Sequence, residues 1–190
     1  MNRIARTLYL AGALVSLAFV ALVTLTVKAD PQSGPDPVQW SLTLKPDSVK
    51  PGGKVLASLT ATIQPGWHMY SLTTPKGGPN PTSAVIADNP AVAGFKVFQP
   101  KPERQMDTAF KIETETFEKE LPLAVEITTK PDAAPGSVDL EAQVRYQACQ
   151  NTLCLPPKRK SAKASLKIDA SAKPSPIKIE AGYTEVPQQH

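Results

Sequence analysis

Proline restricts the fold of this 190-residue sequence more than any other residue, because it occurs 20 times. It has no backbone N–H and its ring clashes inside a helix, so a chain this rich in proline cannot form long helices. Apolar and polar residues alternate instead in residues 40–44, and residues 55–63 form a similar strand-like run. The turn sequence Lys50-Pro51-Gly52-Gly53 lies between these two segments. This pattern predicts two β-strands joined by a turn.

The same pattern recurs along the chain and predicts the fold class. Seven to nine short strands separated by turn residues are typical of an all-β, immunoglobulin-like antiparallel β-sandwich. A closed barrel is the alternative. The further candidate strands are residues 68–72, 83–87, 95–98, 115–121, 123–128, 137–146 and 162–168.

The first 29 residues predict export. Arg3 and Arg6 precede an apolar run over residues 8–27, and Val27-Lys28-Ala29 offers small residues around a cleavage point. The alternative is an uncleaved membrane anchor formed by residues 7–27. Because positive residues stay on the inner side, either interpretation places the rest of the chain across the membrane.

The remaining chain divides into three parts by composition. Residues 30–38 are a linker rich in Pro, Gly, Ser and Asp, and residues 39–169 are the predicted immunoglobulin-like domain. Residues 170–190 form a polar tail in which only Ile177 and Ile179 hint at a strand. The segment 73–81 is a loop, either functional or a plain crossover. About 160 residues suffice for a hydrophobic core without metal or disulfide support.

The charge pattern argues against nucleic-acid binding. The formal net charge is only +4, and the basic excess is concentrated in Lys158-Arg159-Lys160 and Lys163. No basic stripe is combined with aromatic stacking residues.

Two cysteines, Cys149 and Cys154, are the main candidates for chemistry. Their spacing is not C-x-x-C, so a thioredoxin-type site is not indicated. If residues 140–148 form a strand and 150–153 a turn, the cysteines face each other at about 4.5 to 5.5 Å between Cα atoms, which suits a disulfide. Closing so short a loop stabilises the fold by only about 2 kcal/mol.

The cysteine pair has two interpretations at this point. In an exported chain, such a pair is often a permanent structural disulfide. Exchange is favoured if the basic run 158–160 and Arg145 lie near the cysteines, because positive charge favours the thiolate. Pro156-Pro157 also denies the following segment backbone donors, which suits an open edge.

Three motifs together resemble a known family. They are GWHMYS at residues 66–71, DTAF at 107–110 and YQACQNTLCLPP at 146–157. This combination resembles the N-terminal periplasmic domain of the DsbD thiol:disulfide interchange proteins, over roughly residues 40–168. Tyr-Gln-x-Cys followed closely by Cys-x-Pro-Pro is the specific part of the match.

The resemblance implies an immunoglobulin-like redox domain without a cofactor or bound metal. It would accept electrons from a membrane thiol-reductase conduit and pass them to periplasmic thioredoxin-like proteins, a chemistry also used in cytochrome c biogenesis. Cys149 and Cys154 would be the reactive pair, with Cys154 forming the mixed disulfide. A protein-disulfide reductase component is the corresponding enzymatic interpretation, and it is left open.

The resemblance also implies residues around the cysteines. Phe110 corresponds to an aromatic ring on a cap loop that shields the pair until a partner displaces it. Tyr70 and His68 would line the same site, and Tyr146 belongs to the cysteine motif. Three of these residues also have a structural alternative: Phe110 as a core ring, Tyr70 as a cross-strand packing residue and His68 as a structural histidine.

The chain departs from the better-known members in three ways. Their cysteines are one residue further apart, and acidic residues precede the cap ring where this chain has Thr108 and Ala109. Full-length members continue into a membrane conduit and a thioredoxin-like domain, so we expect this chain to act as a stand-alone protein that borrows both, or to perform a different function on the same fold.

Two other functions remain as alternatives. One is a non-catalytic exported binding or assembly sandwich with a structural disulfide. The other is Cu(I) delivery through Cys149, Cys154, His68 and either Met69 or Met106, since thiolate and thioether ligands suit Cu(I). A hydrolase is disfavoured, because no Ser/His/Asp set stands out.

Overall fold

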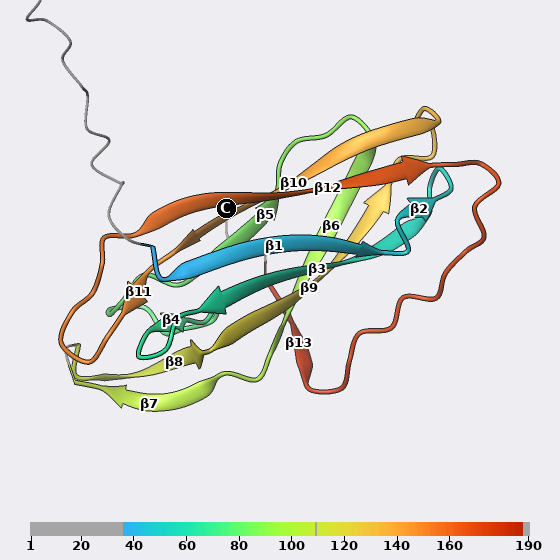
Figure 1. Cartoon of the computed structure of the whole chain (residues 1–190). Helices are drawn as coiled ribbons and strands as arrows, with labels where there is room; N and C mark the ends of the chain where they lie inside the picture. The colour runs from blue at the N-terminus through green and yellow to red at the C-terminus, as the bar shows by residue number, and fades with distance from the viewer. Residues whose placement is uncertain (1–35, 109, 188–190) are drawn as a thin grey trace, which may run out of the picture. The chain divides into compact units, whose positions relative to one another are not determined.

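A computed structural model describes residues 36–108 and 110–187, and this part of the chain is all-β (Figure 1). The predicted signal or anchor, and the linker up to residue 35, lie outside the described residues. Among the described residues, no helix is long and apolar enough to cross a membrane.

The largest sheet has five strands in the order β1-β3-β9-β6-β13. Its strands are β1 (Val38–Lys45), β3 (Lys54–Ile63), β9 (Glu120–Thr129), β6 (Val92–Pro100) and β13 (Tyr183–Val186). Every second residue of β3 is buried, as the alternating sequence predicts.

The second layer is a four-stranded sheet in the order β2-β12-β10-β5. Its strands are β2 (Ser48–Val49), β12 (Lys158–Ile168), β10 (Gly136–Tyr146) and β5 (Ser83–Ile86). The pairing is antiparallel except for the short β2–β12 contact.

The core lies between the inner faces of these two sheets. Its fully buried side chains include Leu59, Leu123 and Ile127 from the first sheet, and Leu140 and Leu166 from the second. The predicted immunoglobulin-like antiparallel sandwich is therefore confirmed. The barrel alternative is wrong, because each sheet has two distinct edge strands.

A smaller third sheet, in the order β11-β4-β8-β7, lies at one end of the sandwich (Figure 1). Its strands are β11 (Ala148–Cys149), β4 (His68–Tyr70), β8 (Ile112–Glu118) and β7 (Glu103–Asp107). The single strand predicted over residues 115–121 is in fact divided at Lys119, whose φ of 64° is left-handed. The chain thus leaves the small sheet as β8 and enters the large one as β9.

The C-terminal segment also differs from its predicted character as a polar tail. Residues 183–186 form β13, which pairs with β6, and Val186 is buried. Ile177 and Ile179, where the sequence hinted at a strand, belong to no strand. β13 can pair with β6 because an edge strand has unpaired backbone N–H and C=O groups, which form hydrogen bonds with a segment that reaches it.

Candidate functional site

A disulfide joins Cys149 and Cys154, with sulfur atoms 2.04 Å and Cα atoms 4.1 Å apart. Two hydrogen bonds flank it: the Gln150 N–H donates to the Leu153 carbonyl (2.7 Å), and the Leu155 N–H donates to the Ala148 carbonyl (3.0 Å). The cysteines are therefore a non-hydrogen-bonded antiparallel pair, the position where facing side chains are closest. The predicted local closure across a turn is what the structure contains.

The two sulfur-bearing residues differ in their access to solvent. Cys149 is only 1% exposed, whereas Cys154 is half-buried. Leu153, directly before Cys154, is 52% exposed. A reagent that approaches this loop from solvent therefore reaches Cys154 before Cys149.

The strand β4 brings His68 beside the disulfide. His68 lies directly opposite Cys149 on one side and Glu118 on the other. The next residue, Met69, is fully buried and points to the opposite face of the strand, as alternate residues must. Met69 therefore cannot join His68 as a ligand of one metal ion.

Metal ligands do not gather elsewhere in the described part of the chain. No group of three or more His, Cys, Asp or Glu residues there is placed to hold a metal ion. Met106, the other thioether considered for Cu(I), is 66% exposed on β7.

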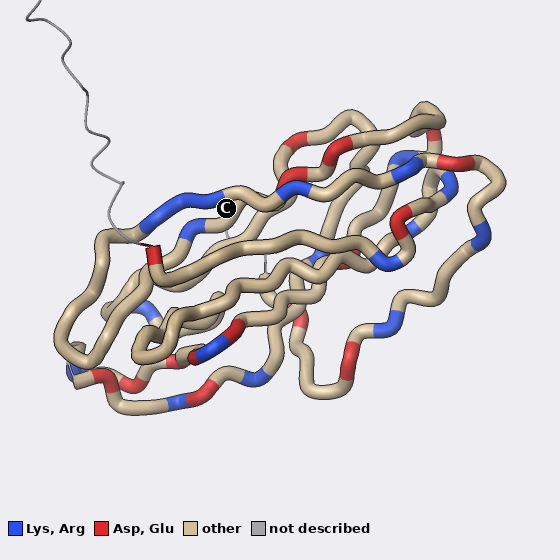
Figure 2. Tube along the Cα trace, viewed as in Figure 1, with Lys and Arg blue, Asp and Glu red and all other residues tan. Residues whose placement is uncertain are grey.

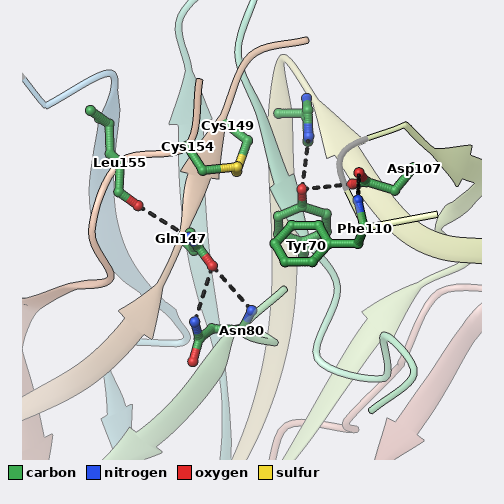
Figure 3. Close-up of a disulfide and its surroundings, with 9 residues drawn as sticks. Tyr70, Asn80, Asp107, Phe110, Gln147, Cys149, Cys154 and Leu155 are labelled. Carbon is green, nitrogen blue, oxygen red and sulfur yellow. Dashed lines mark hydrogen bonds between the residues drawn. A yellow bond between two sulfur atoms is a disulfide. The ribbon is translucent and has the colours of Figure 1, made fainter. Parts of the chain in front are cut away.

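A chain of hydrogen bonds connects β4 to the loop that carries Phe110 (Figure 3). The Tyr70 hydroxyl donates to Asp107 Oδ2 (2.9 Å), and Asp107 Oδ1 accepts the Phe110 N–H (3.1 Å). His68 Nε2 lies 3.4 Å from the Tyr70 oxygen, and because the tyrosine proton is donated to Asp107, His68 is the donor there. Phe110 itself is 36% exposed.

Burial shifts the ionisation of both rings on β4. Desolvation raises the pKa of Tyr70, and its hydrogen bond to the Asp107 carboxylate adds to the shift. Desolvation lowers the pKa of His68, although Asp107 and Glu118 oppose the change. Both side chains are therefore held in their neutral forms near neutral pH.

The side chain of Gln147 joins the disulfide loop to the segment 73–81. Its Nε2 donates to the Leu155 carbonyl (3.2 Å), and its Oε1 accepts bonds from the backbone N–H and Nδ2 of Asn80 (both 3.1 Å; Figure 3). Gln147 is buried, so these bonds are shielded from water. They tie the segment that follows Cys154 to the loop.

The other end of segment 73–81 is held by a buried carboxylate, Glu115. Burial opposes its charged form, but hydrogen bonds from Thr73, Ser71 and Arg104 outweigh burial and lower the pKa. A Cβ atom at Gly78 would lie 2.5 Å from Ile112 Cδ1 and 3.6 Å from Phe110 Cβ. The loop thus packs against the base of the Phe110 loop.

Tyr146 points away from this set. Its hydroxyl donates to Asp36 Oδ2 (2.7 Å), and its ring packs on Trp40 with centroids 5.8 Å apart. The same carboxylate lies 3.7 Å from Lys158 Nζ and 3.4 Å from Lys160 Nζ. Two cations of the basic run 158–160 are therefore already paired.

Sequence reasoning missed the residues that hold the site together. Asp107 was present in the DTAF motif, and its position three residues before Phe110 is a local signal for a side chain that accepts a nearby backbone N–H. Gln147 likewise lies within the cysteine motif. Asn80 and Glu115 gave no signal, because their partners are distant in sequence.

The fold and the disulfide together define a class: an immunoglobulin-like sandwich with a local disulfide at one end. Residues 38–166 match the family described as "Thiol:disulfide interchange protein DsbD, N-terminal". The chain belongs to this family of thiol–disulfide exchange domains. No curated protein matches the sequence.

Two solved structures resemble the chain in fold. The N-terminal periplasmic domain of ScsB from Proteus mirabilis is 21% identical with a TM-score of 0.48, covering 78% of this chain and 51% of that one. The reduced DsbD N-terminal domain from Neisseria meningitidis is 17% identical with a TM-score of 0.40, covering 67% and 86%. The chain thus spans about half the length of the ScsB structure.

Proposed function

We propose that this protein passes reducing equivalents through the Cys149/Cys154 pair, from a membrane electron donor to periplasmic thioredoxin-like proteins. The observation that carries the proposal is the unequal exposure of the two cysteines, with Cys149 buried and Cys154 accessible beside an exposed Leu153. Family membership supports the exchange chemistry. The export signal predicted in residues 1–29 supports the location.

The proposed exchange has two balanced halves. A donor thiolate attacks Cys154 Sγ, the Cys149–Cys154 bond breaks, and Cys149 leaves as a thiolate. The donor's second thiol then resolves the mixed disulfide, so the donor is oxidised and the pair is reduced. In the second half, the Cys154 thiolate attacks the disulfide of the acceptor and Cys149 resolves it, which returns two electrons and two protons to the acceptor.

Phe110 and Tyr70 have a gating role in this proposal. Phe110 lies on a loop held through Asp107, whose carboxylate accepts hydrogen bonds from the Phe110 N–H and the Tyr70 hydroxyl. A partner that displaces this loop would expose Cys154 further, while small oxidants and thiols are kept out. His68 helps to hold Tyr70, and we assign it no proton transfer.

The gating role predicts faster attack on the disulfide in Phe110→Ala. We expect the rate of reduction by dithiothreitol to rise by about fivefold, equivalent to ~1 kcal/mol of lost shielding. Phe95→Ala is the matched control, since Phe95 lies on β6 in the large sheet. Equal rates in the two variants would contradict the gating role.

A redox titration of the purified protein, read by alkylation and mass spectrometry, tests the exchange function. A midpoint above about −300 mV supports exchange, whereas a much lower midpoint favours the alternative, a binding sandwich with a structural disulfide. The burial of Cys149 is the observation that favours this alternative. Under the exchange proposal, Cys149→Ser should trap a mixed disulfide between Cys154 and the partner. Mass spectrometry of the trapped complex then identifies the partner.

A further inference from the structure

Two arginines face each other on the outer surface of the four-stranded sheet. Arg145 on β10 is directly opposite Arg159 on β12, and both point away from the core, because Val144 and Ala162 on the alternate positions are buried. Like charges in directly opposite positions are unfavourable in a sheet. Neither arginine has a carboxylate partner among the described residues, where the nearby Lys158, Lys160 and Lys163 are all ion-paired.

The two arginines line a shallow hollow of about 460 Å³. Arg145 is held in place by a hydrogen bond from its Nη2 to Asn80 Oδ1 (3.1 Å), which leaves its other N–H groups available. The remaining lining is mainly polar, and the only carboxylate in it, Glu141, is neutralised by Lys163 at 3.2 Å. The hollow is therefore an uncompensated basic surface with guanidinium groups suited to carboxylates.

This surface lies at the same end of the molecule as the disulfide. Arg145 precedes Cys149 by four residues, so its Cα is no more than about 14 Å from that of Cys149. Figure 2 shows the basic residues gathered where β12 begins, next to the loop that Figure 1 traces from β11 to β12. A partner that covers about 800 Å² around Cys154 has a footprint radius of about 16 Å, which is similar to the longest span of about 17 Å that the five residues from Cys154 to Arg159 allow.

We propose that Arg145 and Arg159 form a docking surface for a carboxylate-rich face of the redox partner that reacts at Cys154. This inference rests on the proposed exchange function and adds the charge of the partner. The arginines orient and attract the partner and take no part in the sulfur chemistry. Their unpaired charge would then be neutralised only in the complex, where charge complementarity raises the association rate.

The test compares three reductants of the intact protein at low salt: dithiothreitol, an acidic cysteine peptide flanked by glutamates, and a basic one flanked by lysines. In each peptide reaction two peptide thiols form one peptide disulfide while the protein disulfide becomes two thiols. For each reductant, the rate of the double variant Arg145→Gln/Arg159→Gln is divided by the rate of the wild-type protein. This ratio cancels the reactivity of the peptide itself.

We expect the acidic-peptide rate to fall by about tenfold in the double variant, at the low end of electrostatic steering effects. The basic-peptide rate should rise, the dithiothreitol rate should stay unchanged, and the contrast should disappear in 0.5 M salt. Lys167→Gln is the matched control. It removes a cation from the same face of β12, roughly 26 Å further along the strand, and should behave as wild type.

A common change in all three rates, or no change in any, would overturn the docking surface. A second measurement works even if the disulfide does not exchange: NMR shift changes of the labelled protein with an acidic peptide whose cysteine is replaced by serine. Shifts centred on Arg145 and Arg159 support the surface, and their absence overturns it. One further outcome would also overturn it: saturable binding of sulfate together with equal binding of the acidic and basic peptides. The hollow would then be a site for a free anion and not for a protein partner.

Discussion

At the scale of single residues, two buried tyrosines with the same chemistry lie in different surroundings. Tyr70 and Tyr146 are each 1% exposed, and each donates its hydroxyl proton to a carboxylate, Asp107 and Asp36 respectively. Asp107 also anchors the loop of Phe110, whereas Asp36 precedes β1 and pairs with lysines of β12. A comparison of substitutions at the two tyrosines therefore distinguishes a general loss of stability from an effect on the site.

Replacing each tyrosine with phenylalanine uses this difference. Both Tyr70→Phe and Tyr146→Phe should lose about 1 kcal/mol of unfolding free energy, because a partly buried carboxylate loses one donor. Only Tyr70→Phe should raise the rate of disulfide reduction by dithiothreitol. Urea unfolding measures the free energy, and alkylation of samples quenched at successive times measures the reduction rate. Equal reduction rates in the two variants would contradict the role of Tyr70 in holding the loop.

His68 predicts the pH dependence of stability. Its pKa is lower in the folded protein than the ordinary 6.5, so the unfolded chain binds more protons as the pH falls. The stability it contributes is present above the unfolded pKa of 6.5 and is lost progressively as the pH falls from there through the lower pKa of the folded state. Glu115 titrates at lower pH, since its pKa is below the ordinary 4.5.

Urea unfolding at pH 7.5 and 5.5 measures this effect. The wild-type protein should lose more unfolding free energy over this interval than His68→Gln. A larger loss in the variant would show that another group controls stability here.

At the scale of elements, the disulfide loop is a minor contributor to the fold. The disulfide closes a loop of only six residues, and the backbone hydrogen bonds on both sides of the cysteines are made without the sulfur atoms. A pair that cycles between two redox states needs this independence.

The double variant Cys149→Ala/Cys154→Ala should therefore remain folded. We expect a loss of about 2 kcal/mol, which lowers Tm by about 4 to 8 °C for a domain of this size. Far-UV circular dichroism and a thermal melt provide the measurement. Complete unfolding at 25 °C would instead support a structural disulfide.

The elements also differ in how well the sequence predicted them. The central strands β3, β9 and β10 were evident because one face of each is buried and the other polar. β7 was missed because four of its five residues are exposed, so burial imposes no pattern on its sequence. β8 and β9 were merged in part because a left-handed residue such as Lys119 has no distinctive side chain.

At the scale of the whole molecule, the C-terminal segment completes the large sheet. β13 covers the edge of β6, and Lys96 and Glu185 form an ion pair across it at 3.0 Å. Lys178, Glu180 and Tyr183 also line a hollow with residues of β3 and β9. The segment thus shields both an edge and a face of that sheet.

Truncation after Ala181 should expose the β6 edge without unfolding the domain. The lost burial of Val186 alone predicts a decrease of about 1.5 to 3 kcal/mol in unfolding free energy. Size-exclusion chromatography should show self-association through the open edge. An unchanged melting temperature would contradict a structural role for β13.

The sequence by itself determined the fold class and the two cysteines that form the disulfide. Proline density and alternation are local properties that exclude helices and mark buried strand faces, and the cysteines are close enough along the chain to meet across one turn. Only the tertiary structure decided what surrounds them. Asp107 with Tyr70, Gln147 with Asn80 and Arg145 with Arg159 are brought together by pairing between distant segments, and no local pattern records such contacts.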